Sequence, residues 1–372
     1  MANEDKATRY HRLKRRASLA GTAIGALFLL CLLVTGWSAS LRDAAAAASG
    51  GASLPTVIVY VAALVVIGEL LQLPLGLYQE LGLERRYGLS TQTMGKWWLD
   101  RLKGLALGLV FAVAAAIIVL TLIRWSPDRW WLFSAVVFLA LLIGLAQLAP
   151  VVLLPIFYTF TPLDRPELVR RLVTLADRAG AQVMGVFEWR LGDRTRKANA
   201  ALTGIGRTRR ILLSDTLLAE HSDDEIEVIL AHELAHHVYR DIWSGIALEA
   251  VLILAGFAAA DWALTRFSGS FGLLGKDDAA ALPLLTLAAG AVSLLLMPVF
   301  NACSRAHERR ADRYALDTTR NAAAFVSAMK RLAAQNLAEE EPSRVVEVLF
   351  HTHPPTSARI AAARAWSAKN PA

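Results

Sequence analysis

Long apolar stretches separated by short charged connections dominate the first 163 residues and return near residue 280. Five stretches contain no Asp, Glu, Lys or Arg, at 17–41, 44–68, 104–123, 130–163 and 279–304. Each is long enough for the roughly 20 apolar residues that a membrane-spanning helix needs. A weaker sixth stretch is interrupted by Glu249 and Asp261. We therefore predict membrane helices at 17–38, 54–78, 104–123, 130–155, 242–264 and 280–303.

The segment between the fourth and fifth predicted spans is polar and mixes two hydrophobic periods. At 166–180, apolar residues recur every three to four positions between a proline and a glycine, which predicts a helix. Apolar runs separated by turn residues predict strands at 186–191, 198–203 and 210–213. Ser222 and Glu225 match a capping box, so a helix is expected from Asp223 to about Tyr239.

Together these elements predict a mainly α-helical, polytopic membrane protein in two parts. Residues 1–163 would form an N-terminal membrane domain of four helices. Residues 164–372 would form an α+β domain with a small antiparallel sheet, and would also contain the last two membrane helices. A cleaved signal peptide is the alternative for the first stretch. Its apolar core is longer than the usual length of about 7 to 15 residues, however, and further spans follow it.

The composition agrees with a membrane protein and excludes other classes. Apolar residues make up 55% of the 372 residues and charged residues only 19%, which is typical of neither a soluble domain nor a disordered chain. The two cysteines, Cys31 and Cys303, lie in or at the end of apolar stretches, so we expect free thiols. The formal net charge is +7, but no nucleic-acid-binding motif accompanies the basic residues, so no nucleic-acid partner is expected.

Basic residues cluster on alternate connections between the predicted spans. Residues 1–16 carry six Lys or Arg and residues 79–103 carry five, whereas 124–129 and 265–278 carry two each. Because cytoplasmic loops are enriched in Lys and Arg, we expect the N-terminus and the α+β domain to face the cytoplasm. The Ala-rich and Arg-rich composition is typical of a bacterial inner-membrane protein; in a eukaryote, the endoplasmic reticulum membrane would be expected.

The strongest chemical motif is His232-Glu233-Leu234-Ala235-His236, on the helix that the capping box begins. Two histidines four residues apart share one helix face and can bind one zinc ion at about 2.0–2.1 Å. Glu233 lies beside that ion, where it can take a proton from a zinc-activated water. With 8 His and 16 Glu in the chain, such a pattern would arise by chance only about 0.007 times.

A catalytic zinc site of this kind needs a third protein ligand from elsewhere. The candidates are His221, His237, Glu249, His307, Glu308, His351 and His353. His237 lies about 100° off the ligand face of its helix. Glu308 is preferred because two predicted spans separate it from His236, which returns it to the same side of the membrane. Asp312, one helical turn later, would orient a ligand histidine or be a surface charge.

A longer pattern lies at the end of the last predicted span: Asn301-x-x-Ser304-Arg305-x-x-Glu308-x-x-x-Asp312. Together with His232 to His236, it resembles the type I CAAX prenyl protease family of integral-membrane zinc peptidases. Weaker matches follow in the family's order at 73–95, 155–163, 199–218 and 353–359. The resemblance therefore covers most of the chain.

This resemblance implies a gluzincin-type site, in which His232, His236 and Glu308 hold one Zn²⁺ and Glu233 is the general base. It also implies a barrel of membrane helices around a hydrated chamber. The eukaryotic members have seven spans, one more than predicted here. Glu69 and Gln72 are costly in lipid, so we expect them to face this chamber or a helix interface.

The resemblance also implies roles around the metal. Asn199 and Ala200 match an edge strand that would pair with the substrate backbone. His353 would stabilise the developing oxyanion, or be structural. Arg359 would orient a carboxylate or a substrate carbonyl, or be a surface charge.

The expected function is hydrolysis of CAAX-like, prenylated or other membrane-associated peptides and proteins at the cytoplasmic face, in contact with membrane lipids. One alternative is a stress-linked quality-control protease with the same zinc core, although that group has a simpler N-terminal region. Another is a metal transporter. A transporter does not need Glu233, and its ligands would lie within the spans, unlike those predicted here.

Overall fold

The computed structural model describes residues 5–204 and 208–370. In its first half the helices are α1 (Lys6–Val34), α2 (Trp37–Ala48), α3 (Ser53–Gly76), the π-helical η1 (Leu77–Leu83), α4 (Glu84–Arg86), α5 (Met94–Trp125), α6 (Trp130–Leu148), the π-helical η2 (Ala149–Leu153), α7 (Leu154–Phe157) and α8 (Pro166–Arg178). The later helices are α9 (Asp215–Glu220), α10 (Asp223–Val238), α11 (Asp241–Phe267), the 3₁₀ turns η4 (Ser268–Phe271) and η5 (Ala279–Ala281), α12 (Leu282–Thr319), α13 (Ala322–Asn336), α14 (Arg344–Phe350) and α15 (Thr356–Lys369). The strands are β1 (Phe160–Pro162), β2 (Val186–Trp189), β3 (Ala200–Thr203) and β4 (Arg210–Ser214).

Each predicted membrane helix corresponds to a long apolar helix. Within the described residues, six helices or helix runs are long and apolar enough to cross a membrane: Lys6–Val34, Ser53–Arg86, Met94–Trp125, Trp130–Phe157, Asp241–Phe271 and Ala279–Thr319. No more than 22% of the most apolar window of any of them is buried inside the protein. Apolar side chains left outside the protein interior are what a lipid environment accommodates, so the prediction of six spans is confirmed.

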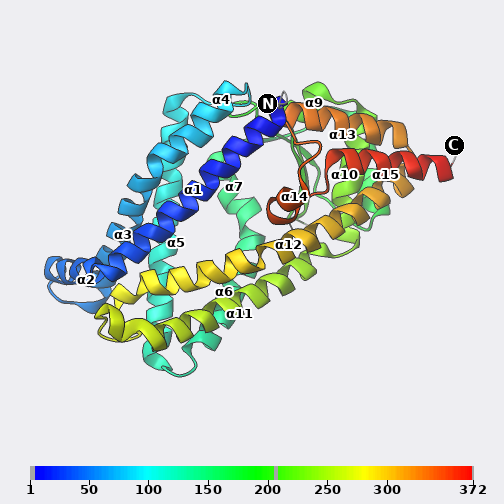
Figure 1. Cartoon of the computed structure of the whole chain (residues 1–372). Coiled ribbons are helices and arrows are strands. Elements are labelled where there is room, and N and C mark those ends of the chain that lie inside the picture. The colour runs from blue at the N-terminus through cyan, green and yellow to red at the C-terminus, as the bar shows by residue number, and fades with distance from the viewer. Residues whose placement is uncertain (1–4, 205–207, 371–372) are drawn as a thin grey trace.

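The six spans form a closed ring. α1 contacts α3, α3 contacts α5, α5 contacts α6, α6 contacts α11, α11 contacts α12, and α12 returns to α1. In Figure 1, α1, α3 and α5 form one side of the molecule, and α6, α11 and α12 run along another. Six helices are therefore sufficient to complete the ring.

One hydrophobic cluster joins the ends of these helices that lie far from the sheet. It contains Leu33 of α1, Ala45 of α2, Tyr60 of α3, Leu120 of α5, Trp130 of α6, Ala260 of α11 and Leu284 of α12. Trp130 is completely buried and donates from Nε1 to Asp261 Oδ1 at 2.7 Å. This bond, together with an ion pair to Lys276, explains how the fifth span tolerates Asp261. The pattern missed α2, whose apolar residues are mainly alanines.

The two polar residues of the second span lie at helix contacts. Glu69 pairs with Arg101 of α5, and Gln72 donates from Nε2 to the carbonyl of Gly21 on α1 at 2.8 Å. Each polar group thus finds a partner on a neighbouring helix, which lowers the cost of placing it within a span. Glu69 also lines a cavity of about 480 Å³ and Gln72 one of about 230 Å³, so both residues lie at helix contacts that border a cavity.

The α+β domain contains a four-stranded sheet in the order β1-β2-β4-β3. β1 pairs antiparallel with β2, and β3 pairs antiparallel with β4, but β2 and β4 are parallel. The prediction of an antiparallel sheet is therefore wrong in part: the sheet is mixed. In a sheet where successive strands pair, all neighbours would be antiparallel, but here β4 inserts between β2 and β3, and β3 becomes an edge. β1 was not predicted.

The sheet and α8, α10, α13 and α15 share a second hydrophobic core. Its fully buried members include Leu172, Ile211, Leu230 and Phe325. α10 packs against β3, α8, α12 and α13, so it lies in the interior of the domain. The predicted capping box is present, because the Ser222 side chain accepts from the backbone of Glu225 and the Glu225 side chain accepts from that of Ser222.

α12 links the membrane to the α+β domain without a break. It has 38 residues, which corresponds to about 57 Å at 1.5 Å per residue. Its first part contains the sixth predicted span, and its last part packs against α10. Because one continuous helix forms both parts, with Pro298 inside it, the residues near 308 are covalently linked to the sixth span through a single helix.

Candidate metal centre

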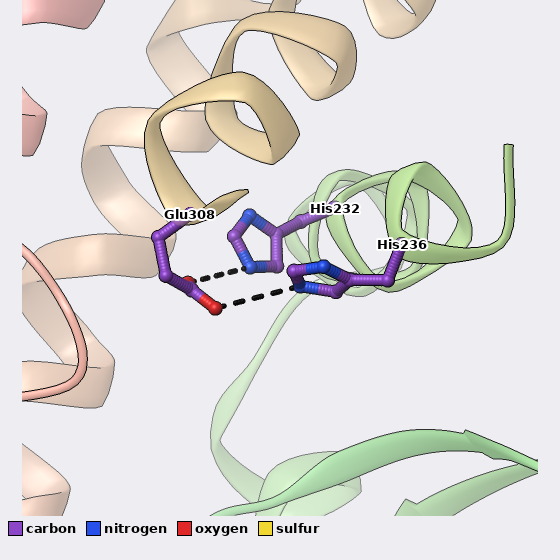
Figure 2. Close-up of side chains that lie close together, drawn as sticks. All are labelled: His232, His236 and Glu308. Atoms are coloured by element: carbon purple, nitrogen blue, oxygen red, sulfur yellow. Dashed lines mark ion pairs between the residues drawn. The ribbon is translucent and has the colours of Figure 1, made fainter. Parts of the chain in front are cut away.

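Two histidines on one face of α10 form the base of the site. His232 and His236 are one helical turn apart, and their ring centroids lie 5.2 Å apart. His232 is 7% exposed, so its imidazole is held inside the protein. The Nε2 atoms of both rings point toward the same carboxylate, that of Glu308 on α12 (Figure 2).

Glu308 completes a group of three candidate metal ligands. Its Oε2 lies 3.1 Å from His232 Nε2, and its Oε1 lies 3.5 Å from His236 Nε2. One ligand atom from each residue can be chosen so that all three lie within 4.8 Å of one another. These residues come from helices that are more than 60 positions apart in the sequence, and the packing of α12 on α10 brings them together.

The donor set fits a bound divalent metal such as zinc. Oε2 of Glu308 is buried and accepts no hydrogen bond of suitable geometry among residues 5–204 and 208–370, although the Nε2 atoms of His232 and His353 lie 3.1 and 3.4 Å from it. A buried carboxylate oxygen without a donor is costly unless a cation compensates it. Two imidazole nitrogens and one carboxylate, with a position left for water, are also the ligands typical of catalytic zinc.

Each histidine is oriented by a carboxylate on its other ring nitrogen. Asp312 Oδ1 lies 2.9 Å from His232 Nδ1. Arg359 holds Asp312 in turn, through two hydrogen bonds of 2.8 and 2.5 Å. Because Nδ1–H donates to the carboxylate, the lone pair of Nε2 is left for a metal. Asp312 therefore contacts a candidate ligand histidine, and Arg359 contacts the carboxylate of Asp312.

His232 binds protons tightly when no metal is present. Burial lowers the pKa of this imidazole, but its hydrogen bonds to Asp312 and Glu308 outweigh burial and raise the pKa to about 9. A metal ion needs the deprotonated Nε2, so binding would displace a proton from this ring.

The second histidine has a partner that the sequence did not reveal. Asp241 Oδ2 lies 2.8 Å from His236 Nδ1, and Asp241 is itself paired with Arg310 of α12. Arg240, between α10 and α11, has a left-handed backbone with φ of 57°, and this turn directs the first residue of α11 back toward α10. Spacing alone does not show such a reversal, so Asp241 could not be distinguished from other acidic residues that begin helices.

We predict that Asp241→Asn will weaken zinc binding about 10- to 100-fold, because the amide no longer holds Nδ1–H of His236 as a charged acceptor. Asp312→Asn should have a similar effect through His232. Competition with a fluorescent zinc chelator measures the affinity. Asp224→Asn is the matched control, since this carboxylate is on the same helix but pairs with Arg171. Unchanged affinity in both site variants would contradict the assigned contacts.

Glu233 lies beside the group with no hydrogen-bond or ion-pair partner among the described residues. Burial raises the pKa of its carboxyl group, while the neighbouring histidines lower it. A carboxylate without a fixed partner, next to the three candidate metal ligands, is free to accept a proton from water.

His353 also reaches the group from the C-terminal segment. Its Nε2 lies 3.4 Å from Glu308 Oε2, and its Nδ1 lies 2.9 Å from the hydroxyl oxygen of Thr352.

The side chains of Asn301 and Arg305 hold the segment that precedes His353. Asn301 donates to the Leu349 carbonyl at 2.7 Å, and Arg305 donates to the His351 carbonyl at 2.7 Å. This explains the long motif, because Asn301, Arg305, Glu308 and Asp312 lie on one buried face of α12.

The other candidates for the third ligand have different contacts. His221 Nδ1 lies 3.2 Å from the Leu217 carbonyl oxygen, and His307 Nε2 lies 3.2 Å from the Ser244 hydroxyl oxygen. His351 faces Glu339, and His237 contacts the backbone of Gly180. Glu249 is on α11, outside the group of three.

Asn199 and Ala200 lie at the start of the edge strand. β3 has β4 on one side and no strand on the other among the described residues. The backbone N–H of Asn199 donates to Ser214 Oγ, and its carbonyl accepts from the Ser214 N–H, both at 2.9 Å. Because strand residues alternate, the backbones of Ala200 and Leu202 face the open side. β3 also contacts α10, which carries the histidines.

Both parts of the chain match models of known protein families. Residues 162–367, more than half of the chain, match the model of peptidase family M48. The chain belongs to this family. Residues 2–159 of this M48 peptidase match a second model, described as CAAX prenyl protease N-terminal with five membrane helices. Four of the six candidate spans lie in that region of the described chain. The resemblance to CAAX prenyl proteases inferred from the motifs is confirmed.

Individual relatives align with most of the length of this M48 peptidase. The uncharacterized metalloprotease YhfN of Bacillus subtilis is 31% identical over 95% of this chain and 84% of its own length. CAAX prenyl protease 1 of Saccharomyces cerevisiae is 29% identical over 80% of this chain and 69% of its own. The crystal structure of S. mikatae Ste24p has the same fold, with a TM-score of 0.87 at 22% identity over 96% of this chain and 88% of that one. The protein is thus a multi-pass membrane metalloendopeptidase.

Proposed function

We propose that this protein is a zinc-dependent endopeptidase that cleaves CAAX-like, prenylated or other membrane-associated peptides and proteins at the cytoplasmic face of the membrane. One observation carries the proposal: His232, His236 and Glu308 offer ligand atoms within 4.8 Å of one another, and Glu233 lies beside them. The match of residues 2–159 to the CAAX prenyl protease N-terminal model favours this group of substrates over those of a quality-control protease.

Zinc, when bound by His232, His236 and Glu308, would supply a Lewis acid that polarises the peptide carbonyl and acidifies water. Glu233 accepts the proton of the attacking water and passes it to the leaving amine nitrogen. His353 donates a hydrogen bond to the developing oxyanion. When the Thr352 hydroxyl is the donor to Nδ1 of His353, the ring proton is on Nε2, the atom that faces the site.

The edge strand positions the substrate. An extended peptide would add to the sheet beside β3 and bond to the outward backbone groups of Ala200 and Leu202. The Asn199 side chain is exposed next to this path and is available to a substrate amide. Recognition through the backbone selects for an extended segment more than for particular side chains, which suits substrates of varied sequence.

The experiment that tests this function is a substrate trap. Cells in which Glu233→Gln replaces the native form should accumulate uncut membrane-associated proteins, and mass spectrometry of the membrane fraction identifies them. Cleavage in native cells creates new C-termini that should be missing from the variant cells. These new C-termini should lie in the cytoplasmic segments of the substrates. Identical peptide profiles in native and variant cells would count against the proposal.

We infer that the N-terminus and the metal centre face the cytoplasm, because the basic residues are concentrated at 1–16 and 79–103. α11 and α12 lie between the two halves of the site, and two crossings return the chain to the same side. A reporter fused after residue 320 should therefore give a cytoplasmic signal, and a fusion after residue 127 should give the opposite one. A periplasmic or lumenal signal after residue 320 would reject this orientation.

A further inference from the structure

His353 lies on a loop that gives its side chain little support. The loop covers residues 351–355, between α14 and α15. The side chain of His353 is 58% exposed, and its only hydrogen bond among the described residues joins it to the neighbouring Thr352. A group that stabilises an oxyanion has to be held to within about 0.5 Å of its place. The position of His353 is therefore set through the backbone of its loop, which Arg305 holds on one side.

The residues just after α13 contact this loop on both sides of His353. Nε2 of His351, two positions before it, lies 3.6 Å from Oε2 of Glu339. The hydroxyl of Ser357, four positions after it, donates to the carbonyl of Glu340 at 3.0 Å. Residues 339 and 340 thus brace the loop from the side opposite α12.

Glu339 is buried and is joined to the first membrane helix. The residue is only 6% exposed. Nη1 of Arg15 on α1 donates to its Oε2 at 2.5 Å, and Nη2 donates to its Oε1 at 3.4 Å. Removing one partner of a buried ion pair leaves an uncompensated charge, which is strongly unfavourable. The pair therefore fixes residue 339 to α1.

α1 holds the same segment at a second point, Leu337. This residue ends α13 with a left-handed backbone, φ 53°, which is unfavourable for a residue with a large side chain. Its side chain packs against the cluster that contains Tyr10, Leu83 and Tyr87. Its carbonyl oxygen lies 2.9 Å from Nε2 of His11. These contacts stabilise the turn that brings Glu339 to Arg15.

The candidate metal ligands are held by other elements. His232 contacts Glu308 and Asp312 of α12, and His236 contacts Asp241 of α11. Within residues 5–204 and 208–370, no hydrogen bond or ion pair of these three ligands involves α1. A shift of α1 would therefore act on the loop of His353 before it acted on the metal group.

We propose that Glu339 is a positioning residue that links the first membrane helix to His353, so that the oxyanion donor is in place only when α1 occupies its position in the ring. This rests on the proposed function, because it assumes that His353 contacts the developing oxyanion. The chain of contacts is Arg15 to Glu339 to His351, which is two residues from His353. It makes the rate of cleavage depend on the packing of α1, while metal binding does not.

Hydrogen–deuterium exchange on the purified full-length protein tests the link without a substrate. In Glu339→Gln and in Arg15→Met, the backbone amides of residues 351–358 should exchange about 10-fold faster, because a charged contact that closes the loop is lost. The amides of α10 should keep their native rates. Glu340→Gln is the matched control, since this neighbouring side chain is exposed and forms no ion pair among the described residues. Native exchange of 351–358 in both variants would overturn the proposal.

Cleavage of an N-terminally labelled prenylated peptide tests whether the link serves catalysis. Glu339→Gln should lower kcat about 10- to 100-fold, with KM and zinc content near the native values, because a small displacement of the donor affects the transition state more than the bound substrate. Arg15→Met should cause the same loss, and the double variant no greater one. Arg15→Lys should retain most of the rate. In a His353→Ala background, Glu339→Gln should have no further effect.

His11→Ala gives a second variant at the same junction if Glu339→Gln does not fold. It removes the contact with the Leu337 carbonyl without leaving a buried charge unpaired, and it should lower kcat in the same way. Native kcat in Glu339→Gln would overturn the proposal, as would a loss that multiplies with that of His353→Ala. Absence of zinc-dependent cleavage by the native enzyme would instead reject the proposed function.

Discussion

Glu233→Gln is expected to lose peptide hydrolysis by about 100- to 10,000-fold while the protein keeps its zinc. Glutamine has nearly the same shape as glutamate but cannot accept the proton of the attacking water. Glu233 is not one of the three candidate ligands, so its charge is not needed to hold the ion. Cleavage of a labelled prenylated peptide measures activity, and metal analysis of the purified variant should give about one zinc per chain.

The matched control is Glu227→Gln, on the same helix. Glu227 pairs with Arg171 of α8 and lies away from the histidines, so this variant should retain native activity and zinc. The two results together separate loss of the general base from a general disturbance of α10. Normal turnover by Glu233→Gln would remove this residue from the mechanism, whereas loss of zinc in the variant would show that the carboxylate also stabilises the metal.

Glu308→Ala is expected to lose both zinc and activity. The substitution removes one of three candidate ligands, so the loss of affinity should exceed the roughly 10- to 100-fold loss typical of a residue that only orients a ligand. It also leaves two imidazoles without the carboxylate that lies 3.1 Å and 3.5 Å from their Nε2 atoms. Zinc content after dialysis against a mild chelator, followed by peptide cleavage in added zinc, measures both effects.

Asp317→Ala is the control for this variant. Asp317 is also on α12, but it accepts from Arg313 and Trp366 rather than facing α10. It should retain zinc after the same dialysis. If Glu308→Ala keeps about one zinc per chain, the third ligand lies elsewhere. His353 is then the first alternative, because its Nε2 lies 3.4 Å from Glu308, and the double variant Glu308→Ala, His353→Ala would decide between them.

The sequence predicted the features that depend on local patterns. The membrane helices follow from uninterrupted apolar stretches, because a span must satisfy its own backbone hydrogen bonds and present apolar side chains along its whole length. α10 was predicted from its capping box, whose two partners lie only three residues apart. The pair His232 and His236 shares a helix face because of the helical period alone.

The motif on α12 was predictable for a related reason. Asn301, Arg305, Glu308 and Asp312 recur at helical spacing, so a helix that continues past residue 303, where the predicted span ended, places them on one face. What that face contacts was not visible in the pattern. Asn301 and Arg305 turned out to hold the segment that leads to His353, through carbonyl groups more than 40 residues away.

The tertiary structure alone decided which distant groups meet. The parallel pairing of β2 with β4 makes β3 an edge strand, the reversed turn at Arg240 brings Asp241 to His236, and the contact of α1 with α12 closes the ring with six helices. Each of these depends on contacts between segments that have no periodic relation in the sequence.

A hydrophobic period or a helix cap specifies how one helix or strand forms, because the residues involved are neighbours in the chain. The neighbours of that element are chosen by the packing of the whole molecule, and this packing decides which candidate metal ligands and which carboxylates beside them meet.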